Sequence, residues 1–590
     1  MKFRKLAEYF EEIEKTSSRL EMTAILAKML KEADTTEVDL LVYLALGRLR
    51  PKFEGIEFNM AEKMMLRVIS SGYNIKLDQV EAEYKKIGDL GEVVRLRTFE
   101  HLRVRNLSKG LSVTQVYQRL MDVAVDEGLG SQERKVLSLA RLLKDLDSLE
   151  AKFVVRIPVN NLRLGFSEMT VLDSLSWMET GDKSLRIELE RAFNVSADIG
   201  RIARIFKESG LKGISQVKVE IGVPIRPAKS ERLPSVEKIV EKLEVFAVEG
   251  KWDGLRLQIH YDKGKHMLLS GQEDLFGKTN KSLVRIFSRN LDNMTAMFPD
   301  VAKAMESLAI KSVILDGEAV AYDPKTGKLK PFQETMQRKR KHGISQLAGE
   351  LPIKVFVYDI LALDGEMVMG KSFRERRKLL EKILKIAPEG LILADQEIVS
   401  DAKRLRELMM MYLKQGLEGV MCKKLSTAYQ AGARNFNWVK LKKATEGDLT
   451  DTIDCVVMGY YSGKGKRTGF GIGAFLVGVV DEKGQVGSIA KIGTGLTDEQ
   501  WKELYERAEK LKVAEKPEEY VVAKTLEPDV WVRPELVVEI LADEITKSPI
   551  HAFELALRFP RLINFRDDKN LSEATSKREL KRLFEMQKTG

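Results

Sequence analysis

The first third of the chain carries apolar residues at helical spacing. The pattern is seen in Leu40, Leu41, Tyr43, Leu44 and Leu46, which recur at helical spacing. Gly47 follows where a glycine that ends a helix belongs, and Thr36 with Asp39 resembles a capping box in front of it. Only KFVVRIPV, residues 152–159, is short and β-branched enough to predict a strand or an extended crossing. We therefore expect the first third to be all-helical.

The periodicity breaks at KGISQVKVEIGVPIRPAKSERLPS, where prolines and small polar residues predict a linker and a domain boundary near residue 220. Beyond it, strand-like runs such as SVILDGEAVAYD and IKVFVYDILAL alternate with helical segments such as SFRERRKLLEKILKI. This alternation predicts a mixed α+β domain that ends near Lys443.

The last part of the chain has short β runs separated by glycines, as in GFGIGAFLVGVVDEKGQVGSIAKIG. One helix and the run WVRPELVVEILADEIT follow, a spacing typical of a small closed barrel of the OB type. The sequence thus predicts a multi-domain protein, with an all-α domain at 1–220, an α+β domain at 221–443 and a β-barrel OB-fold domain at 444–590.

Composition sets the class of protein. A chain of 590 residues is too long for one hydrophobic core, so several domains are expected. With 44% hydrophobic and 32% charged residues it is an ordinary globular protein and not a disordered one. The net charge of +10 permits a polyanionic partner without establishing one.

Cysteine use and the absence of an apolar leader indicate location. Cys422 and Cys455 are far apart in sequence and can form neither a disulfide framework nor a four-cysteine zinc site, so we expect an intracellular, cytoplasmic protein. The sequence contains no stretch of 18 uncharged apolar residues, so no membrane segment is expected. Few His with abundant Lys, Glu and Arg are typical of proteins from hot environments.

The tetrapeptide KWDG, starting at Lys251, is the first candidate for chemistry. It stands between the apolar run VFAVEG and the alternating run LRLQIH, at the edge of a strand. Such a lysine is most often solvated, but a nucleophilic lysine needs burial or nearby cations that favour its neutral form. WVKLKK supplies cations, because Lys440 and Lys442 lie on one side of a strand, where both amines can point at one phosphate. Alone, they could equally be an exposed polar face.

Two acids and an aromatic residue complete a nucleotide-transfer set. Glu318 of LDGE and Glu418 of LEGVM each lie at the edge of an apolar run. Either could be a surface acid, but together they could hold the divalent cation that nucleotidyl transfer requires. Phe356 of FVYD, alone best explained as core, could stack on adenine. The order KWDG, SRN, LDGE, FVYD, EGVM, WVKLK within about 200 residues is not credible as chance.

This ordered set resembles the signature of ATP-dependent DNA ligases of the archaeal and eukaryotic replicative type, within the nucleotidyltransferase superfamily. The resemblance extends over the whole chain. GDLGEV at residues 88–93 and LRLG at residues 162–165 resemble the helical DNA-binding domain of that family, and ALRFPRLINFRDDK resembles part of its OB domain. The resemblance therefore implies a DNA-binding domain, an adenylation domain and an OB-fold domain in that order.

The resemblance also implies roles for single residues. Lys251 would carry the adenylate within a motif that includes Asp253, and Glu249 would read the adenine amino group. Glu318 would bind the ribose hydroxyl and hold metal together with Glu418. The implied nucleotide contacts are Glu249, Arg256, Arg289, Glu318, Phe356, Arg434, Lys440 and Lys442. The implied last motif, which orients pyrophosphate, contains Arg561, Asp567 and Lys569.

The chain departs from the family pattern at two places. GQEDLFGKTNKSLVRIF, residues 271–287, is expected to be an insert where most relatives have a tight hairpin. This insert weakens the alignment of Arg289 with the nucleotide-contacting arginine of the family. Asn564 stands where the family usually has an arginine, so pyrophosphate contacts are expected to be thinner.

The implied activity is the sealing of 5′-phosphate/3′-hydroxyl nicks in duplex DNA during replication, repair and recombination. ATP and Mg²⁺, or Mn²⁺ in its place, would be required. The partner would be nicked DNA bound by a monomer, with a sliding clamp as a further candidate for RLRTFEHLRVR at residues 95–105.

Three alternatives share parts of this pattern. A capping guanylyltransferase or RNA ligase would have the same core, but the helical first third argues against both. An NAD-dependent ligase needs a cysteine-bound zinc that two cysteines cannot supply. A non-catalytic DNA clamp would have no reason to keep Lys251, Glu318, Glu418, Lys440 and Lys442.

Overall fold

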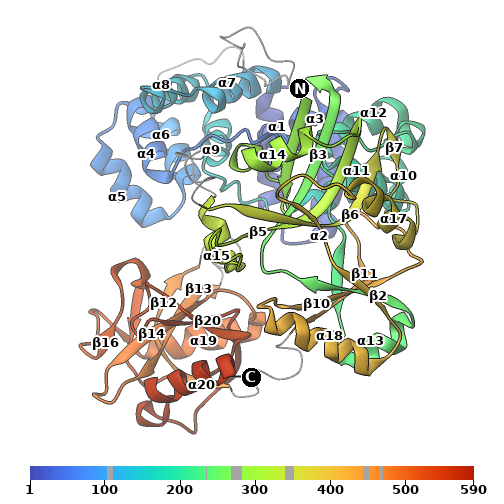
Figure 1. Ribbon diagram of the computed structural model, residues 1–590. Coiled ribbons are helices and arrows are strands. Elements are labelled where there is room, and N and C mark those ends of the chain that lie inside the picture. The colour runs from blue at the N-terminus through green and yellow to red at the C-terminus, as the bar shows by residue number, and fades with distance from the viewer. Residues whose placement is uncertain are drawn as a thin grey trace. The chain divides into compact units, whose positions relative to one another are not determined.

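The structure is a computed structural model that describes residues 1–102, 110–233, 235–266, 282–338, 351–442, 452–463 and 470–589. The chain forms two compact units (Figure 1). One contains residues 1–232 and 239–440, and the other contains residues 233–238 and 441–590. Each unit has its own buried apolar core.

The chain from Phe3 to Ser215 folds into helices, as its periodicity predicts. Ser112 begins one of them with a capping box, in which its side chain accepts a hydrogen bond from Gln115 N at 3.2 Å. The helices are α1 (Phe3–Glu14), α2 (Arg19–Glu32), α3 (Val38–Ala45), η1 (Lys52–Glu54), α4 (Glu62–Tyr73), α5 (Leu77–Ile87), α6 (Leu90–Leu102), α7 (Val113–Val125), α8 (Ser131–Lys144), α9 (Ser148–Arg156), α10 (Glu168–Thr180), α11 (Arg186–Ser196) and α12 (Ile199–Ser215).

The predicted strand at residues 152–159 is wrong, because its first five residues belong to helix α9. Asp147 starts this helix with a capping box to Glu150, and residues 149–156 are all buried by neighbouring helices. Tertiary burial and a strong cap thus override the β preference of the paired valines.

The capping box predicted at Thr36 and Asp39 is also absent. The residue before α3 is Glu37, which makes no side-chain cap and instead accepts hydrogen bonds from the amino group of Met1 at 2.7 and 2.8 Å. Gly47 does adopt the left-handed conformation expected of a glycine just beyond a helix, with φ of 70°.

The segment from Lys229 to Lys442 contains two mixed sheets, as the alternation of strands and helices predicts. One has the strand order β1-β11-β10-β2-β9 and the other β4-β3-β5-β6-β7, with β8 beside β6. The elements are β1 (Lys229–Arg232), α13 (Val236–Leu243), β2 (Phe246–Lys251), β3 (Leu255–His266), β4 (Ser282–Ser288), η2 (Thr295–Met297), α14 (Pro299–Glu306), β5 (Ser312–Ala321), α15 (Phe332–Thr335), η3 (Met336–Arg338), β6 (Ile353–Leu363), β7 (Glu366–Met367), α17 (Phe373–Ile383), β8 (Leu391–Leu393), β9 (Gln396–Val399), α18 (Ala402–Lys414), β10 (Gly419–Lys424) and β11 (Arg434–Lys442).

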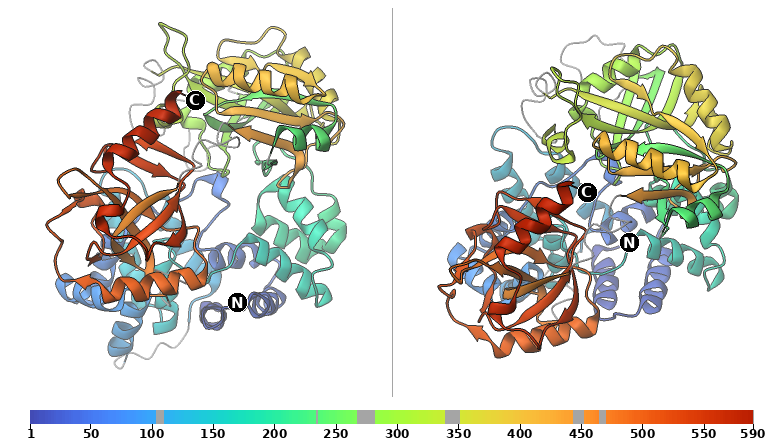
Figure 2. Two further views of the ribbon diagram at one scale, coloured as in Figure 1. Left: turned by 90° about the horizontal axis from the view of Figure 1, so that it is seen from below. Right: turned by 60° about the horizontal axis from the view of Figure 1, so that its bottom comes forward.

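The second unit is rich in strands. Its main sheet runs β15-β17-β12-β13-β14-β16, and β18 joins β12 to β21. The elements are β12 (Ile453–Ser462), β13 (Ile472–Val480), β14 (Val486–Ile492), α19 (Asp498–Lys510), β15 (Lys512–Val513), β16 (Tyr520–Val521), η6 (Lys524–Leu526), β17 (Val530–Val532), β18 (Val537–Leu541), β19 (Glu544–Lys547), β20 (Leu555–Arg558), β21 (Arg561–Phe565), η7 (Leu571–Glu573) and α20 (Lys577–Thr589). Helices α19 and α20 pack on different sides of these strands (Figure 2).

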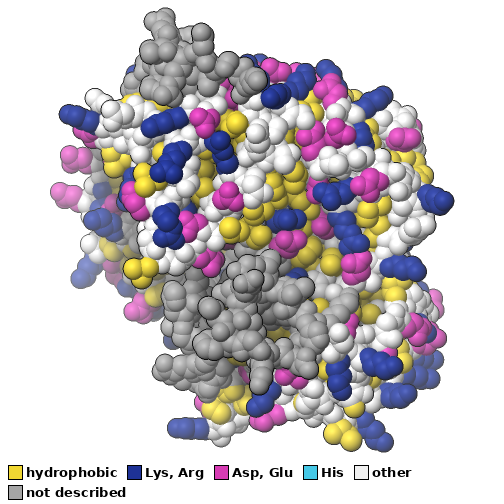
Figure 3. Space-filling model, turned by 90° about the horizontal axis from the view of Figure 1, so that it is seen from above, with side chains coloured by type: hydrophobic (Ala, Val, Ile, Leu, Met, Phe, Trp, Pro, Cys, Tyr) yellow, Lys and Arg dark blue, Asp and Glu magenta, His cyan; other side chains and the backbone are white. Residues whose placement is uncertain are grey.

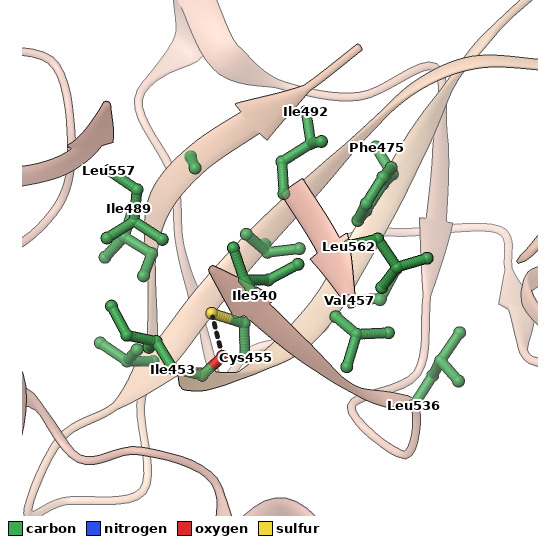
Figure 4. Close-up of a cluster of buried hydrophobic side chains, with 14 of the residues drawn as sticks. Ile453, Cys455, Val457, Phe475, Ile489, Ile492, Leu536, Ile540, Leu557 and Leu562 are labelled. Atoms are coloured by element: carbon green, nitrogen blue, oxygen red, sulfur yellow. Dashed lines mark hydrogen bonds between the residues drawn. The ribbon is translucent and has the colours of Figure 1, made fainter. Parts of the chain in front are cut away.

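Inward-facing residues of β12, β13, β14 and β18 fill the core of this unit (Figure 4). Cys455 lies among them, and its thiol donates a hydrogen bond to Ile453 O at 3.5 Å. Cys422 of β10 is buried in the first unit. Burial raises the pKa of both thiols.

Candidate active site

Strand pairing brings Lys251 and Glu418 together from positions 167 residues apart. Antiparallel pairing of β2 with β10 places Gly419 opposite Lys251, and Glu418 N donates a hydrogen bond to Lys251 O at 3.0 Å. The side chains form an ion pair with Nζ 2.7 Å from Oε2. Lys251 is 22% and Glu418 18% exposed, so both are within reach of a ligand.

Gly254 allows the KWDG loop to lie directly on strand β5. A Cβ at this position would meet the carbonyl oxygen of Ala319 and would lie 2.8 Å from Val320 Cγ2 and 3.0 Å from Glu318 Cγ. Backbone cannot move aside as a flexible side chain can, so only glycine fits. The loop after Lys251 is thereby fixed against the strand that carries Glu318.

Glu318 lies on β5, opposite Arg256 of β3 and opposite Phe356 of β6. Burial raises the pKa of Glu318 to about 7, although Lys251 and Arg256 oppose the rise. Glu418 adds to the rise, so the two predicted metal-binding acids affect each other's charge. In the described part of the chain, no three His, Cys, Asp or Glu side chains converge on a metal site.

Arg256 is held inside the domain by Asp316, a buried residue of the LDGE motif. Its Nε and Nη2 donate to the two Asp316 oxygens at 3.0 and 2.5 Å, and its Nη1 donates to Ala228 O at 2.8 Å. Tyr429 and Tyr358 also donate to Asp316, at 3.0 and 3.2 Å. Despite the opposing effect of burial, Asp316 raises the pKa of Arg256 well above its usual value.

Phe356 stacks on Trp252, an aromatic residue that the sequence did not single out. The ring centroids are 4.6 Å apart and the planes differ by 11°. Trp252 is buried, whereas Phe356 remains partly exposed. The sequence signal for Trp252 was its place inside KWDG, two residues from the glycine that lies on β5.

Glu249, two residues before Lys251 on β2, forms a fully buried ion pair with Lys423 of β10. Glu249 Oε2 lies 2.6 Å from Lys423 Nζ, and both side chains are 1% exposed. Lys423 was also not singled out from the sequence, since a lysine in the run GVMCKKL is most simply a solvated strand residue. The pair depends on the register of β2 and β10, which places Lys423 opposite Ala247 and diagonal to Glu249.

Strand β11 has the alternation predicted for WVKLKK. Val439 and Leu441 are fully buried, whereas Lys440 and Lys442 are partly exposed on the other side. Strand β11 belongs to the same sheet as β2, with β10 between them. The structure therefore places both lysines on the sheet that carries Lys251.

Arg289 and Arg434 line one cavity of about 470 Å³ within the first unit. Arg226 and Lys229 line it as well, and burial and then Arg226 lower the pKa of Lys229. Further lining residues from the helical region include Arg48, which forms an ion pair with Glu168 at 2.9 Å, and Lys52. The cavity is suited to phosphate groups.

The two segments that resemble DNA-binding loops are joined by Arg163. Its Nη2 donates a hydrogen bond to Gly88 O at 2.9 Å, and its Nη1 lies 2.7 Å from Asp89 Oδ2. Asp89 also accepts hydrogen bonds from Gly91 N at 2.7 Å and from buried Arg156. GDLGEV and LRLG are therefore in direct contact, although most of their residues are buried.

Residues of the predicted last motif lie in the second unit. Lys569 pairs with Asp454 at 2.5 Å, Arg561 pairs with Asp543, and Asp567 pairs with Arg507. Asn564, at the family's arginine position, donates a hydrogen bond to Glu539 at 3.1 Å. They belong to a different unit from Lys251, so their part in the chemistry stays a prediction.

Two predictions fall partly on residues outside those described. Of the insert expected at residues 271–287, residues 282–287 belong to strand β4, which pairs with β3, while residues 267–281 lie outside the described residues. The segment at 95–105, a candidate for clamp binding, includes residues 103–105, which also lie outside them. None of the helices in the described part of the chain is long and apolar enough to span a bilayer.

Three family models match successive parts of the chain. They describe a DNA ligase N terminus at residues 2–176, an ATP dependent DNA ligase domain at 227–442 and an ATP dependent DNA ligase C terminal region at 468–569. The matches follow the order of the helical, mixed and strand-rich parts.

Similar proteins match from end to end. A probable DNA ligase of Dictyoglomus turgidum is 42% identical over 598 residues, which cover 100% of this chain and 98% of the relative. DNA ligase 2 of Thermofilum pendens is 38% identical, with 99% and 97% covered. The solved structure Pmar-Lig_Pre superposes with a TM-score of 0.55 at 17% identity, covering 95% of this chain and 99% of its own, a likeness of fold.

Proposed function

The chain belongs to the ATP-dependent DNA ligase family, and we propose that it seals nicks in duplex DNA through an adenylate carried on Lys251. The observation that supports this assignment most directly is that Lys251 at the end of β2, Glu418 just before β10 and Glu318 of β5 act on one another at one partly exposed site. An amine beside two acids is suited to nucleotidyl transfer. Gly254 supports this interpretation, because the absence of a side chain there lets the loop after Lys251 lie against the strand that carries Glu318.

In the first step, Lys251 Nζ leaves its ion pair with Glu418, loses a proton to water and attacks the α-phosphorus of ATP. The N–P bond forms as the bond to the bridging oxygen breaks, and pyrophosphate leaves with that electron pair. Lys440 and Lys442 would stabilise the negative charge that develops on the α-phosphate. Glu249 and Phe356 would hold the adenine, one by a hydrogen bond and the other by stacking.

In the second step, a 5′-phosphate oxygen of the nick attacks the phosphorus of the lysine adenylate, and Lys251 regains its amine. The 3′-hydroxyl then attacks the activated 5′-phosphorus, which forms the phosphodiester bond and releases AMP. Holding the reacting groups in line can lower the barrier by about 7 to 11 kcal/mol.

Glu318 and Glu418 fit a divalent cation. Mg²⁺ is commonly held by one or two carboxylates together with substrate phosphate oxygens, so two acids suffice. Burial raises the pKa of Glu318 to about 7, and a bound cation would oppose this rise because it favours the charged carboxylate. When bound, Mg²⁺ or Mn²⁺ would draw charge from the phosphates as pyrophosphate leaves.

We assign DNA binding to residues 1–220, adenylation to residues 221–443 and an OB-fold role in both DNA and ATP steps to residues 444–590. The joined loops at Gly88 and Arg163, and the cavity lined by Arg289 and Arg434, are the features that favour phosphate contacts. A nick has no sequence of its own, so recognition through phosphates and duplex shape is expected.

The test is to incubate the purified chain and Lys251→Ala with α-³²P-ATP and Mg²⁺, to separate the protein by denaturing electrophoresis, and then to add nicked DNA. We expect label on the wild-type chain alone, and its discharge with formation of a longer DNA strand. Discharge by RNA ends but not by nicked DNA would contradict the substrate. No label with any nucleotide would contradict the reaction.

A further inference from the structure

Lys423 is a lysine with no access to water. Its ammonium lies 4.5, 4.8 and 4.6 Å from the ring centroids of Tyr358, Phe373 and Trp438, and it donates a hydrogen bond to Tyr358 O at 3.3 Å. Glu249 provides the only carboxylate that pairs with it among the described residues, at 2.6 Å. Burying both charges of this pair costs desolvation, and breaking it by removing one partner would leave an uncompensated buried charge.

Glu249 has a second carboxylate oxygen that takes no part in the ion pair with Lys423. It lies two residues before Lys251 on β2, so both side chains project from the same face of the strand. While Oε2 faces Lys423, Oε1 is buried and has no hydrogen-bond partner among the described residues. A buried acceptor without a donor is costly, so a donor from a ligand is the natural explanation.

Lys423 is paired with Glu249 at 2.6 Å and favours its charged form. Burial raises the pKa of Glu249, whereas Lys423 and then Arg377 act in the opposite direction. An ionised carboxylate can only accept hydrogen bonds, while a protonated one can also donate. An accepting group favours an exocyclic amino group, as on C6 of adenine, and rejects a carbonyl oxygen at the same position.

We infer that Lys423 is a positioning residue that determines nucleobase choice, by holding Glu249 as an ionised acceptor for the 6-amino group. The inference rests on the proposed function, because it concerns how the same site selects ATP. Lys423 does not touch the nucleotide and acts only through Glu249. Without it, the buried Glu249 takes up a proton and can donate to a 6-oxo base.

Lys423→Met tests this, because methionine suits a cage of aromatic rings and removes only the charge. The probes are α-³²P-labelled ATP and ITP, which differ in a 6-amino against a 6-oxo group. Formation of the labelled enzyme is followed in single turnovers over a range of nucleotide concentrations, which gives a second-order rate constant of adenylation for each nucleotide. We expect the ratio of these rate constants, ATP over ITP, to fall by about tenfold or more in Lys423→Met. Glu249→Gln, which can both donate and accept, should lower the ratio similarly, and Lys423→Arg should restore it.

Lys135→Met is the matched control. Lys135 is also a buried lysine, 5% exposed, and donates to backbone carbonyls in the helical region, far in sequence from the site. It should leave the ratio unchanged. If Lys423→Met slows both nucleotides by one common factor, Lys423 is only structural and the inference is overturned. If the wild type takes no label at all, the proposed function fails instead.

Discussion

Glu318 illustrates, at the scale of one residue, a conflict between stability and chemistry. Its folded pKa is about 7, against an ordinary value of 4.5, because burial disfavours the charged form. Between these pH values the folded chain binds a proton that the unfolded chain has released. Stability contributed by this group therefore falls as the pH rises through that range.

We expect Glu318→Gln to be inactive in adenylation but more stable than the wild type. At pH 8 without divalent cations, its free energy of unfolding should be higher by about 1 to 3 kcal/mol, and the difference should shrink toward pH 5. Urea unfolding at both pH values measures it. A difference that does not change with pH would exclude ionisation of Glu318 as its cause.

At the scale of elements, helix α9 shows where a local pattern misleads. Lys152–Arg156 has the branched residues of a strand, but Asp147 accepts hydrogen bonds from Leu149 N at 2.8 Å and Glu150 N at 3.0 Å, and these fix the start of a helix. The same cap signal is readable in the sequence as an Asp three residues before a Glu.

Asp147→Ala should lower the free energy of unfolding of the full chain by about 1 kcal/mol, because the helix loses its cap. Asp147→Asn is the control, since asparagine caps equally well but cannot form the ion pair that Asp147 makes with Arg4 at 2.9 Å. Urea unfolding compares the two. Equal losses in both variants would attribute the effect to the ion pair.

The motifs and the alternation of strands and helices were predictable because several candidate residues stand at the edge of an apolar run. Lys251, Glu318 and Glu418 illustrate this. What could not be predicted are contacts that depend on register between strands distant in sequence, such as Trp252 on Phe356 and Lys423 on Glu249. A shift of one residue would separate each pair, and nothing local to either strand fixes that register.

At the scale of the whole molecule, the net charge of +10 is the difference between 98 Lys and Arg and 88 Asp and Glu, so most basic residues are matched in number by acids. Lys and Arg are interspersed with Asp and Glu on the face shown in Figure 3. Basic residues gather locally, as at Lys229, whose pKa is lowered by burial and then by neighbouring arginines, while Glu190 acts in the opposite direction. Phosphate binding should depend on such places and be sensitive to salt.

Affinity for nicked duplex DNA should therefore fall steeply with salt, and Lys229→Ala should make the slope of log Kd against log salt shallower by about one. Arg404→Ala is the control, because Arg404 is neutralised by Glu397 at 2.6 Å and Glu407 at 2.8 Å. Fluorescence anisotropy at several salt concentrations gives both slopes. Equal slopes for Lys229→Ala and the wild type would show that Lys229 does not contact the DNA.

The burial of Cys422 and Cys455 makes the wild-type chain a ready background for labelling. Neither thiol is exposed, and the raised pKa of each keeps it protonated and unreactive toward maleimides. A cysteine introduced on the surface of each unit could then carry a donor or acceptor dye without removal of the native residues. Energy transfer between the dyes would follow the distance between the units through each step of a single sealing cycle.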